Sequence, residues 1–368
     1  MLKKSVQSHQ IRVLLLGLGS VATDTHGGGH LRQYLDDPEI IVVAGVDSLQ
    51  SARERAMRKG IPAVYENFYE ALEKEEFDYV SVLTPTHMHL ECCRMVANAQ
   101  KNILCEKPIA HQLEDAVEIE RVVKANNVSF SVSMNLRFLP VVKQIQDDIE
   151  KGKLGKLFFI DFDECTSFNW ATYGYRNPES KILAKEPFWG NPENFGLQRL
   201  VISDKAVHFI DLIIRWSGEK ILSVYAQGGC HGSHMDAGEN FANITLHLSG
   251  GVQSRLLHIW GSHFDDRAGG ELSTRIRILG EDGTAIYESS EKGIAGEYTI
   301  FKEQKQTYSL KFPPSRRTDF AESLKYLAKL SSKEKTDYEN LNHSLKLMNV
   351  IEACYKSIET NSVVEIKG

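Results

Sequence analysis

A short apolar run, residues 11–16 (IRVLLL), ends directly in Gly17-Leu18-Gly19-Ser20-Val21-Ala22. The run predicts a buried strand, and the G-x-G-x-x-A pattern after it is typical of a tight turn from a strand into a helix. The first glycine permits the turn, the second lets a ligand approach the backbone, and Ala22 permits close packing. Such turns also occur without a ligand. In either case we expect this start to open a parallel α/β sheet.

Alternating strands and helices continue from this turn to residue 134. Strands are predicted at residues 40–46, 79–83, 102–105 and 128–134, and helices at 51–59, 68–74 and 113–124. This alternation predicts a doubly wound parallel sheet, which is the Rossmann fold. We expect the domain to occupy residues 1–138, because the pattern changes after Pro140.

The second predicted domain, residues 139–368, has a different pattern. A helix at 141–150 is followed by alternating apolar and polar strands at 157–163, 241–248, 252–260, 274–279 and 284–287. Helices at 319–330 and 340–358 close the chain. The pattern predicts an α+β domain with a large, mainly antiparallel open sheet. A length of 368 residues also favours two domains, since it exceeds one ordinary core.

Composition excludes several classes of protein. The formal net charge is −6 and there is no basic block, so nucleic acid is not an expected partner. Six cysteines without Cys-x-x-Cys spacing indicate reduced thiols in a cytoplasmic protein and no zinc site. No run is long enough to span a membrane. Lys3 and Lys4 could begin a signal peptide, but the apolar run is short and contains Gly17 and Gly19, which favours a strand.

The glycine turn and the second strand together predict a dinucleotide site. Asp47 ends the second strand, where a carboxylate can accept hydrogen bonds from the adenosine ribose and repels a 2′-phosphate. We therefore expect NAD rather than NADP, although Arg53 and Arg55 lie nearby. The phosphates are expected to meet the start of the first helix, with contacts from Gly17, Gly19, Ser20, Val21 and Ala22.

An apparent insertion, residues 23–29 (TDTHGGG), lengthens the usual spacing between the glycine turn and Asp47. It is predicted to be a flexible loop beside the cofactor. His26 and His30 are a weaker indication of a metal, and no metal site is predicted.

Two further polar segments follow strands of the first sheet. Thr84-Pro85-Thr86-His87-Met88-His89 comes after residues 79–83, and Glu106-Lys107-Pro108 after residues 102–105. Ligands of open α/β sheets bind at the carboxyl ends of strands. The first segment is therefore expected to pass the nicotinamide half of the cofactor, and Lys107 to place a charge against a substrate oxygen. The alternatives are a metal at His87 and His89, which lack further ligands by spacing, and an ordinary solvated lysine.

Asp204, His208 and Asp211 would share one face of a helix, because they stand at positions i, i+4 and i+7. A histidine beside carboxylates is held in one orientation and its protonated form is favoured. This suits a general base for an alcohol proton. The alternative is that Asp204 caps the helix and His208 is an ordinary surface residue.

Residues 165–198 form a long segment without predicted secondary structure, and it is rich in aromatic residues and arginine. Long loops inside compact domains are usually functional. Aromatic rings with polar tips suit a polyhydroxylated ring substrate, and the candidate contacts are Trp170, Tyr175 and Arg176. A loop that packs against another subunit is the alternative.

These four motifs, namely the glycine turn, residues 84–89, Glu106-Lys107-Pro108 and Asp204-x-x-x-His208, occur in the order and spacing of the Gfo/Idh/MocA oxidoreductases. From Ile11 to about Tyr287 the chain resembles that family. The resemblance implies a Rossmann domain, a C-terminal α/β domain whose open sheet forms dimer or tetramer contacts, and a nicotinamide cofactor. It also implies a sugar, nucleotide-sugar or cyclitol substrate. Residues 197–208 (LQRLVISDKAVH) depart from the family pattern, because they lack glycines that members often carry.

The resemblance also implies roles for individual residues. Glu106-Lys107-Pro108 would lie by the nicotinamide, Asp204 and His208 would meet the reacting hydroxyl, and Asn135 and Arg137 would line the same pocket. We therefore expect an NAD(H)-dependent dehydrogenase or reductase that acts on a secondary alcohol or ketone of a carbohydrate-like ring, as a homodimer or homotetramer. The alternatives are a reductase of a non-sugar ring, such as a dihydrodiol or tetrapyrrole, and a non-catalytic NAD-binding regulator. The expected catalytic residues are Lys107, Asp204 and His208.

Overall fold

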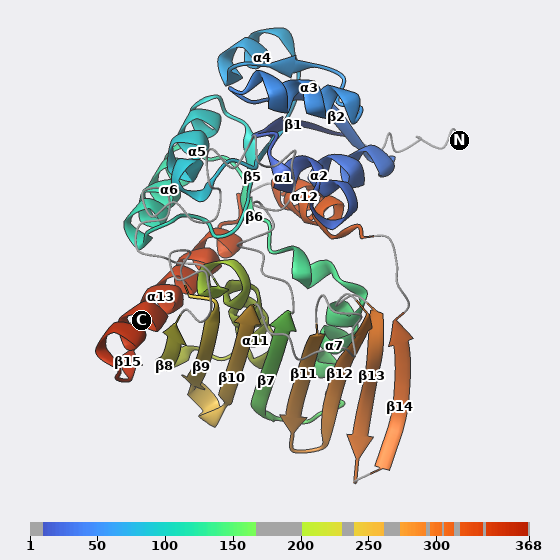
Figure 1. Cartoon of the computed structure of the whole chain (residues 1–368), viewed down its shortest axis with the longest axis vertical. Coiled ribbons are helices and arrows are strands. Elements are labelled where there is room, and N and C mark those ends of the chain that lie inside the picture. The colour runs from blue at the N-terminus through green and yellow to red at the C-terminus, as the bar shows by residue number, and fades with distance from the viewer. Residues whose placement is uncertain are drawn as a thin grey trace. The chain divides into compact units, whose positions relative to one another are not determined.

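The computed structural model describes residues 10–166, 201–229, 239–260, 273–291, 295–303, 305–312, 317–333 and 336–366. The chain forms two compact units. The first contains Met1–Phe138 and Arg317–Leu345, and the second contains Leu139–Arg316 and Lys346–Gly368. Each unit is built around its own sheet (Figure 1).

The first unit has a parallel sheet of six strands in the order β3-β2-β1-β4-β5-β6. This is the strand order of a doubly wound dinucleotide-binding fold, so the predicted Rossmann class is confirmed. Its strands are buried on both faces, as parallel strands covered by helices are. They are β1 (Ile11–Leu16), β2 (Ile40–Val46), β3 (Val64–Tyr65), β4 (Tyr79–Val82), β5 (Asn102–Cys105) and β6 (Phe130–Val132).

Helices connect these strands, and two 3₁₀ turns, Thr86–Met88 and Asn135–Phe138, follow β4 and β6. The three helices with predicted bounds, α3, α4 and α6, begin and end within two residues of those bounds, because their apolar spacing is regular. They are α1 (Ser20–Thr23), α2 (Thr25–Asp36), α3 (Gln50–Arg58), α4 (Phe68–Lys74), α5 (His89–Asn98) and α6 (Leu113–Asn126).

Residues 23–29, predicted to be a flexible loop, are instead the junction between two helices. α1 ends at Thr23 and α2 begins at Thr25. Gly29 has a φ of +64°, and a Cβ at this position would lie 2.5 Å from backbone atoms of Val21 and Ala22. The glycine run is therefore explained by the close approach of α2 to α1, and the loop prediction is wrong.

A helix from near the end of the chain completes the first unit. α12 (Asp319–Ser331) lies beside α2, as Figure 1 shows in orange-red and blue. The predicted domain boundaries placed this helix in the second domain, whereas the structure assigns it to the first. The reason is its apolar face, which joins the buried cluster of β1 and α2 through Phe320, Ala321, Leu324 and Leu327.

The start of α12 is held by polar contacts to α2 and to the turn after β6. Gln33 Oε1 accepts hydrogen bonds from the backbone N–H groups of Phe320 at 2.8 Å and Ala321 at 3.4 Å. Asp319 is 1% exposed, and both its oxygens accept from Arg317, at 2.9 and 2.5 Å. Asn135 Nδ2 donates to the same carboxylate at 2.6 Å. A carboxylate at a helix N-terminus is also favoured by the helix dipole.

The second unit has a mixed sheet of nine strands in the order β14-β13-β12-β11-β7-β10-β9-β8-β15. Among the described strands of this sheet, only β7 and β10 pair in parallel, so the predicted, mainly antiparallel sheet is confirmed. The strands are β7 (Leu157–Thr166), β8 (Ile221–Gly229), β9 (Phe241–Leu248), β10 (Gln253–Trp260), β11 (Ser273–Gly280), β12 (Gly283–Glu291), β13 (Ala295–Lys302), β14 (Lys305–Phe312) and β15 (Val364–Glu365).

Helix α11 (Val207–Ser217) packs on one face of this sheet. The ring of Phe162 on β7 lies 4.7 Å from Phe209 and stacks on Trp216 at 5.6 Å. The unit also contains α7 (Pro140–Glu150) and most of α13 (Glu339–Thr360). In the part of the chain that the structure describes, no helix has the length and hydropathy needed to cross a membrane.

Replacing Asp319 with alanine should destabilise the first unit by about 3–5 kcal/mol, because it leaves the buried Arg317 charge without its carboxylate. Urea unfolding monitored by circular dichroism measures the change. Glu70→Gln is the matched control, since Glu70 pairs with Lys74 on the surface of α4 and such i, i+4 pairs contribute about 0.3–0.5 kcal/mol. Equal losses in the two variants would contradict the proposed anchoring of α12.

Candidate active site

Gly17 and Gly19 have different roles in the turn after β1. Gly17 has a φ of +95°, and a Cβ there would lie 2.8 Å from backbone atoms of Leu83 and Thr84, so a side chain does not fit. A Cβ added to Gly19 would meet no atom within 4 Å. The backbone of Gly19 therefore faces open space, which is what the pyrophosphate of a dinucleotide requires. The turn fits the predicted cofactor.

Asp47 connects this turn to the end of β2. Its carboxylate accepts hydrogen bonds from the backbone N–H groups of Leu18 at 2.8 Å and Leu49 at 2.9 Å. Each oxygen has a second lone pair, so the half-buried carboxylate can still accept from ribose hydroxyls. The two amides fix the orientation of the acid, a support that the sequence alone does not reveal.

The arginines near Asp47 are engaged by backbone carbonyls. Arg53 donates to the carbonyl oxygens of Asp47 at 2.6 Å and Ser48 at 3.0 Å. Arg55 donates to that of Leu18 at 2.9 Å. Both side chains thus stabilise the loops that hold Asp47, so the carboxylate is the group best placed for the ribose. This geometry agrees with NAD rather than NADP.

His89 ties together the two polar loops that follow β4 and β5. Its ring is 1% exposed, with Nε2 at 3.0 Å from the carbonyl oxygen of Thr84 and Nδ1 at 3.0 Å from that of Pro108. Burial lowers the pKa of His89, although these carbonyls act in the opposite direction. His89 therefore has a positioning role, and its predicted contact with the cofactor stays a prediction. Contacts from the rest of this loop stay predictions, for Thr84, Pro85 and His87.

Glu106 is a buried carboxylate that supports the backbone of Lys107. Its Oε1 lies 2.8 Å from Nε2 of His30, and its Oε2 accepts from the backbone N–H of Lys107 at 3.1 Å. Burial acts to raise the pKa of Glu106, but the hydrogen bond from His30 and the positive charge of Lys107 outweigh it and lower the pKa. Glu106 thus supports the backbone of Lys107, and its predicted contact with the cofactor stays a prediction.

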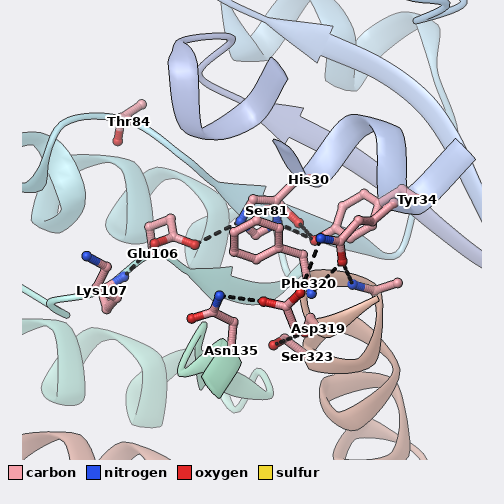
Figure 2. Close-up of polar contacts among 12 residues, drawn as sticks. His30, Tyr34, Ser81, Thr84, Glu106, Lys107, Asn135, Asp319, Phe320 and Ser323 are labelled. Carbon is pink, nitrogen blue, oxygen red and sulfur yellow. Dashed lines mark hydrogen bonds and ion pairs between the residues drawn. The ribbon is translucent and has the colours of Figure 1, made fainter. Parts of the chain in front are cut away.

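From the sequence, His30 was considered only as a possible metal ligand. Instead, His30 is fully buried on α2 and stacks on Phe320 with ring centroids 3.9 Å apart. Its Nδ1 lies 2.9 Å from the hydroxyl of Tyr34, which in turn lies 3.0 Å from Ser81 Oγ (Figure 2). Within the described ranges, no group of three or more His, Cys, Asp or Glu residues could hold a metal ion.

Asn135 and Arg137, predicted to line the pocket, both contact the C-terminal part of the first unit. Asn135 is 5% exposed and its amide nitrogen donates to Asp319. Arg137 donates to the side-chain oxygen of Asn340 at 3.2 Å. The contacts place Asn135 beside the start of α12, as Figure 2 shows, so its first role is to hold that helix. The predicted ligand contacts of the two residues stay predictions.

In the second unit, Asp204 stands on a π-helical turn, Ile202–Ala206, that leads directly into α11. Such turns are widened helices and are frequent at functional sites. His208 lies in the first turn of α11 and is 6% exposed, so the alternative of a surface histidine is wrong. The predicted i, i+4, i+7 spacing assumed a regular α-helix. The π turn widens the helix between Asp204 and the later residues. Asp211 pairs with Arg215 on α11 at 3.4 Å.

A second ionisable cluster lies beside this turn and was not predicted. Glu164 of β7 and His258 of β10 are register partners, and Lys205 Nζ lies 3.8 Å from Glu164 Oε1. Burial raises the pKa of Glu164, and it lowers that of His258 to about 3 with help from the Lys205 charge. The sequence predicts only alternating strands in this region. The signal that could have revealed the cluster is the presence of two ionisable residues, Glu164 and His258, at inward-facing positions. Trp170, Tyr175 and Arg176 lie outside the described residues.

Both units match known protein-family models. Residues 11–134 match the model described as an oxidoreductase family with an NAD-binding Rossmann fold. Residues 146–366 match the model described as the C-terminal alpha/beta domain of an oxidoreductase family. The NAD-binding first domain predicted from the glycine turn is thereby confirmed.

Individual relatives are distant. An uncharacterized oxidoreductase, YrbE of Bacillus subtilis, is 22% identical over 289 residues, which are 76% of this chain and 74% of the relative. D-apiose dehydrogenase of Paraburkholderia graminis is 24% identical over 69% of this chain and 62% of its own length, less than two thirds of that relative. An oxidoreductase of Agrobacterium radiobacter, solved with NAD+, L-tartaric acid and magnesium, has a TM-score of 0.79 at 20% identity, covering 97% of this chain and 98% of its own.

The carboxylate of Asp47 should make the protein bind NADH about tenfold or more tightly than NADPH, because juxtaposed like charges are unfavourable. A tenfold difference corresponds to about 1.4 kcal/mol. Quenching of protein fluorescence on titration with each nucleotide measures it, and Asp47→Ala should narrow the gap. Arg53→Ala is the matched test of the opposite idea. The arginine would outweigh the carboxylate if the wild type bound NADH and NADPH equally well and Arg53→Ala lost affinity for NADPH.

Proposed function

The chain belongs to the Gfo/Idh/MocA family of oxidoreductases, and we propose that it transfers a hydride between NAD and a secondary alcohol or ketone of a sugar, nucleotide-sugar or cyclitol. The observation that carries the proposal is Lys107. The lysine follows the carboxyl end of β5, where ligands of such sheets bind, and its backbone is fixed by a buried carboxylate. A cation held in this way suits a substrate oxygen on which charge develops.

Three side chains share the chemistry in this proposal. His208 takes the proton of the substrate hydroxyl as general base, and Asp204 orients the substrate or the histidine. Lys107 holds the oxygen and stabilises the developing alkoxide charge. NAD, when bound, accepts the hydride at C4 of its nicotinamide. In the reductive direction the same groups work in reverse, with His208 returning the proton.

The fit of the first unit to NAD supports this assignment. Gly19 presents an open backbone to the phosphates, and Asp47 is held by two amides at the ribose position. The sugar-like substrate is supported by D-apiose dehydrogenase among the relatives and by the polar aromatic segment of residues 165–198. Which hydroxylated ring is used depends on that segment and on Arg137.

The open face of the second sheet supports the proposal of a homodimer or homotetramer. Described residues on this face include Phe159, Arg255, Leu257, Arg275 and Arg277, which are partly or fully exposed in the single chain. A nine-stranded sheet with helices described on one face has a broad surface for a second copy. Sedimentation velocity would distinguish a monomer from either assembly.

Lys107→Ala and His208→Ala should each lower kcat strongly in an assay of NAD reduction with a panel of sugars and cyclitols. Loss of a general base costs about 10²–10⁴-fold, and loss of one oxyanion-stabilising group about 10²–10³-fold. The double variant should lose less than the product of the single losses, because groups that act as a unit are not additive. NADH affinity should change much less.

Lys151→Ala is the control, since Lys151 pairs with Asp147 on the surface of α7 and should retain wild-type kcat. Unchanged kcat in either active-site variant would contradict the mechanism. A structure with NAD bound that places Lys107 Nζ more than about 10 Å from the ring of His208 would do the same, because a base must reach its proton directly or through one water. NADH binding without turnover of any substrate would favour the regulator alternative.

A further inference from the structure

We propose that His30 is a positioning residue for Lys107, acting through Glu106. The inference rests on the proposed function of Lys107 as the cation at the substrate oxygen, and it adds a residue from α2 to that site. A line of contacts in the first unit runs from the sheet to the lysine (Figure 2).

The two oxygens of Glu106 are divided between His30 and Lys107. Oε1 faces Nε2 of His30 at 2.8 Å, and Oε2 accepts from the backbone N–H of Lys107 at 3.1 Å. A carboxylate held at both oxygens has one orientation, and this orientation sets the direction in which the chain leaves β5. His30 thus determines where the Lys107 backbone begins.

His30 is itself held from two other sides. Phe320 of α12 stacks on its ring at 3.9 Å, and the Tyr34 hydroxyl lies 2.9 Å from Nδ1. Burial raises the pKa of Tyr34, so the phenol stays neutral and keeps its proton. With Glu106 as a carboxylate, the bonds are satisfied when Ser81 donates to Tyr34, Tyr34 to Nδ1, and Nε2–H to Glu106. This chain of hydrogen-bond donors, formed by Ser81, Tyr34 and His30, then points toward the carboxylate of Glu106.

The pairing of His30 with Glu106 also determines how much negative charge lies beside Lys107. The titratable groups around the Glu106 carboxylate are His30 and Tyr34 from α2, Cys105 and Lys107 from its own segment, and His89 from α5. A buried carboxylate without a partner either takes up a proton or draws in the nearest cation. Without His30 we expect the carboxylate to take up a proton, so that Lys107 loses the charged oxygen that holds its backbone N–H.

A purely structural role for His30 is the competing explanation, because the ring also packs α2 against α12. The two explanations differ in their dependence on Lys107. If His30 acts through Lys107, its replacement matters only while the lysine is present. A packing defect would lower kcat in any background.

The first experiment measures kcat and KM of His30→Ala in the wild-type and Lys107→Ala backgrounds. We expect a loss of about 10–100-fold in kcat in the wild-type background, the size found when partners that orient active-site ligands are removed. KM for NAD should change little, and in the Lys107→Ala background the further loss should be less than about twofold. Equal losses in both backgrounds would overturn the proposal.

Milder variants cover the case in which His30→Ala does not fold. His30→Gln keeps an N–H donor for Glu106 and should recover most of kcat, whereas Tyr34→Phe removes only the outer hydroxyl and should cause a small, Lys107-dependent loss. Tyr79→Phe is the matched control, because Tyr79 makes a similar contact of 2.7 Å to Ser331 and lies outside the chain of donors. A loss in Tyr79→Phe equal to that in Tyr34→Phe would count against the proposal.

The second experiment does not depend on activity. Infrared difference spectra of the carboxylic acid C=O stretch at neutral pH should show no protonated Glu106 in the wild type. In His30→Ala a new acid band should appear, and adding Glu106→Gln should remove it. No band in His30→Ala, or a band in the wild type, would overturn the inference about Glu106. Absence of turnover in the wild type, with the infrared result as expected, would instead reject only the proposed function.

Discussion

A carboxylate buried at the end of a strand is costly unless it is paired, and the site of the first unit depends on how Glu106 meets that requirement. The sheet delivers Glu106 to the carboxyl edge, where its partners are His30 from α2 and the neighbouring Lys107. His30 supplies the hydrogen bond at Oε1, the backbone of Lys107 supplies the one at Oε2, and the positive charge of Lys107 acts as well. One buried charge therefore couples the cofactor side of the fold to the lysine.

The same reasoning applies to Asp319, which explains why a late helix belongs to the first unit. Arg317, Asn135 and Gln33 all donate to its carboxylate, and Gln33 is 286 residues away in the sequence. These donors hold the N-terminus of α12 so that Phe320 reaches the ring of His30. The carboxylates of Glu106 and Asp319 are thus connected through the stacked rings of His30 and Phe320. We expect a substitution at either carboxylate to alter the surroundings of the other.

Local signals predicted the elements and the glycine turn well, because each depends on residues close together in sequence. β1, β2, β5 and β9 have the predicted bounds, since their apolar patterns are uninterrupted. β8, β13 and β14 were not predicted because glycines or polar and charged residues interrupt their apolar runs. Residues 23–29 were misassigned because three consecutive glycines usually indicate a loop, whereas here they allow α2 to approach α1.

The site was only partly predictable, and the missing part is its support. Lys107 and Asp47 are recognisable from position alone, since each follows a strand. The partners that hold them are not, because His30, the Leu18 amide and α12 reach them only through tertiary contacts. The π turn at Asp204 is likewise invisible in the sequence, because a widened turn needs no special residue.

The proposed reaction requires different chemical groups from the two units. A hydride and a proton must leave the same carbon–oxygen group, so a cation near the nicotinamide and a base near the hydroxyl must act on one substrate. Lys107 is rigidly supported, through Glu106, on the unit that carries the NAD site. His208 and Asp204 stand on the other unit, at a helix whose first turn is widened. In the proposed reaction the first unit would bind the nucleotide and polarise an oxygen, and the second would accept a proton, so neither unit holds both functions. The proposed oxidation therefore requires residues of both units, and the support of Lys107 by Glu106 and His30 belongs to the first of them.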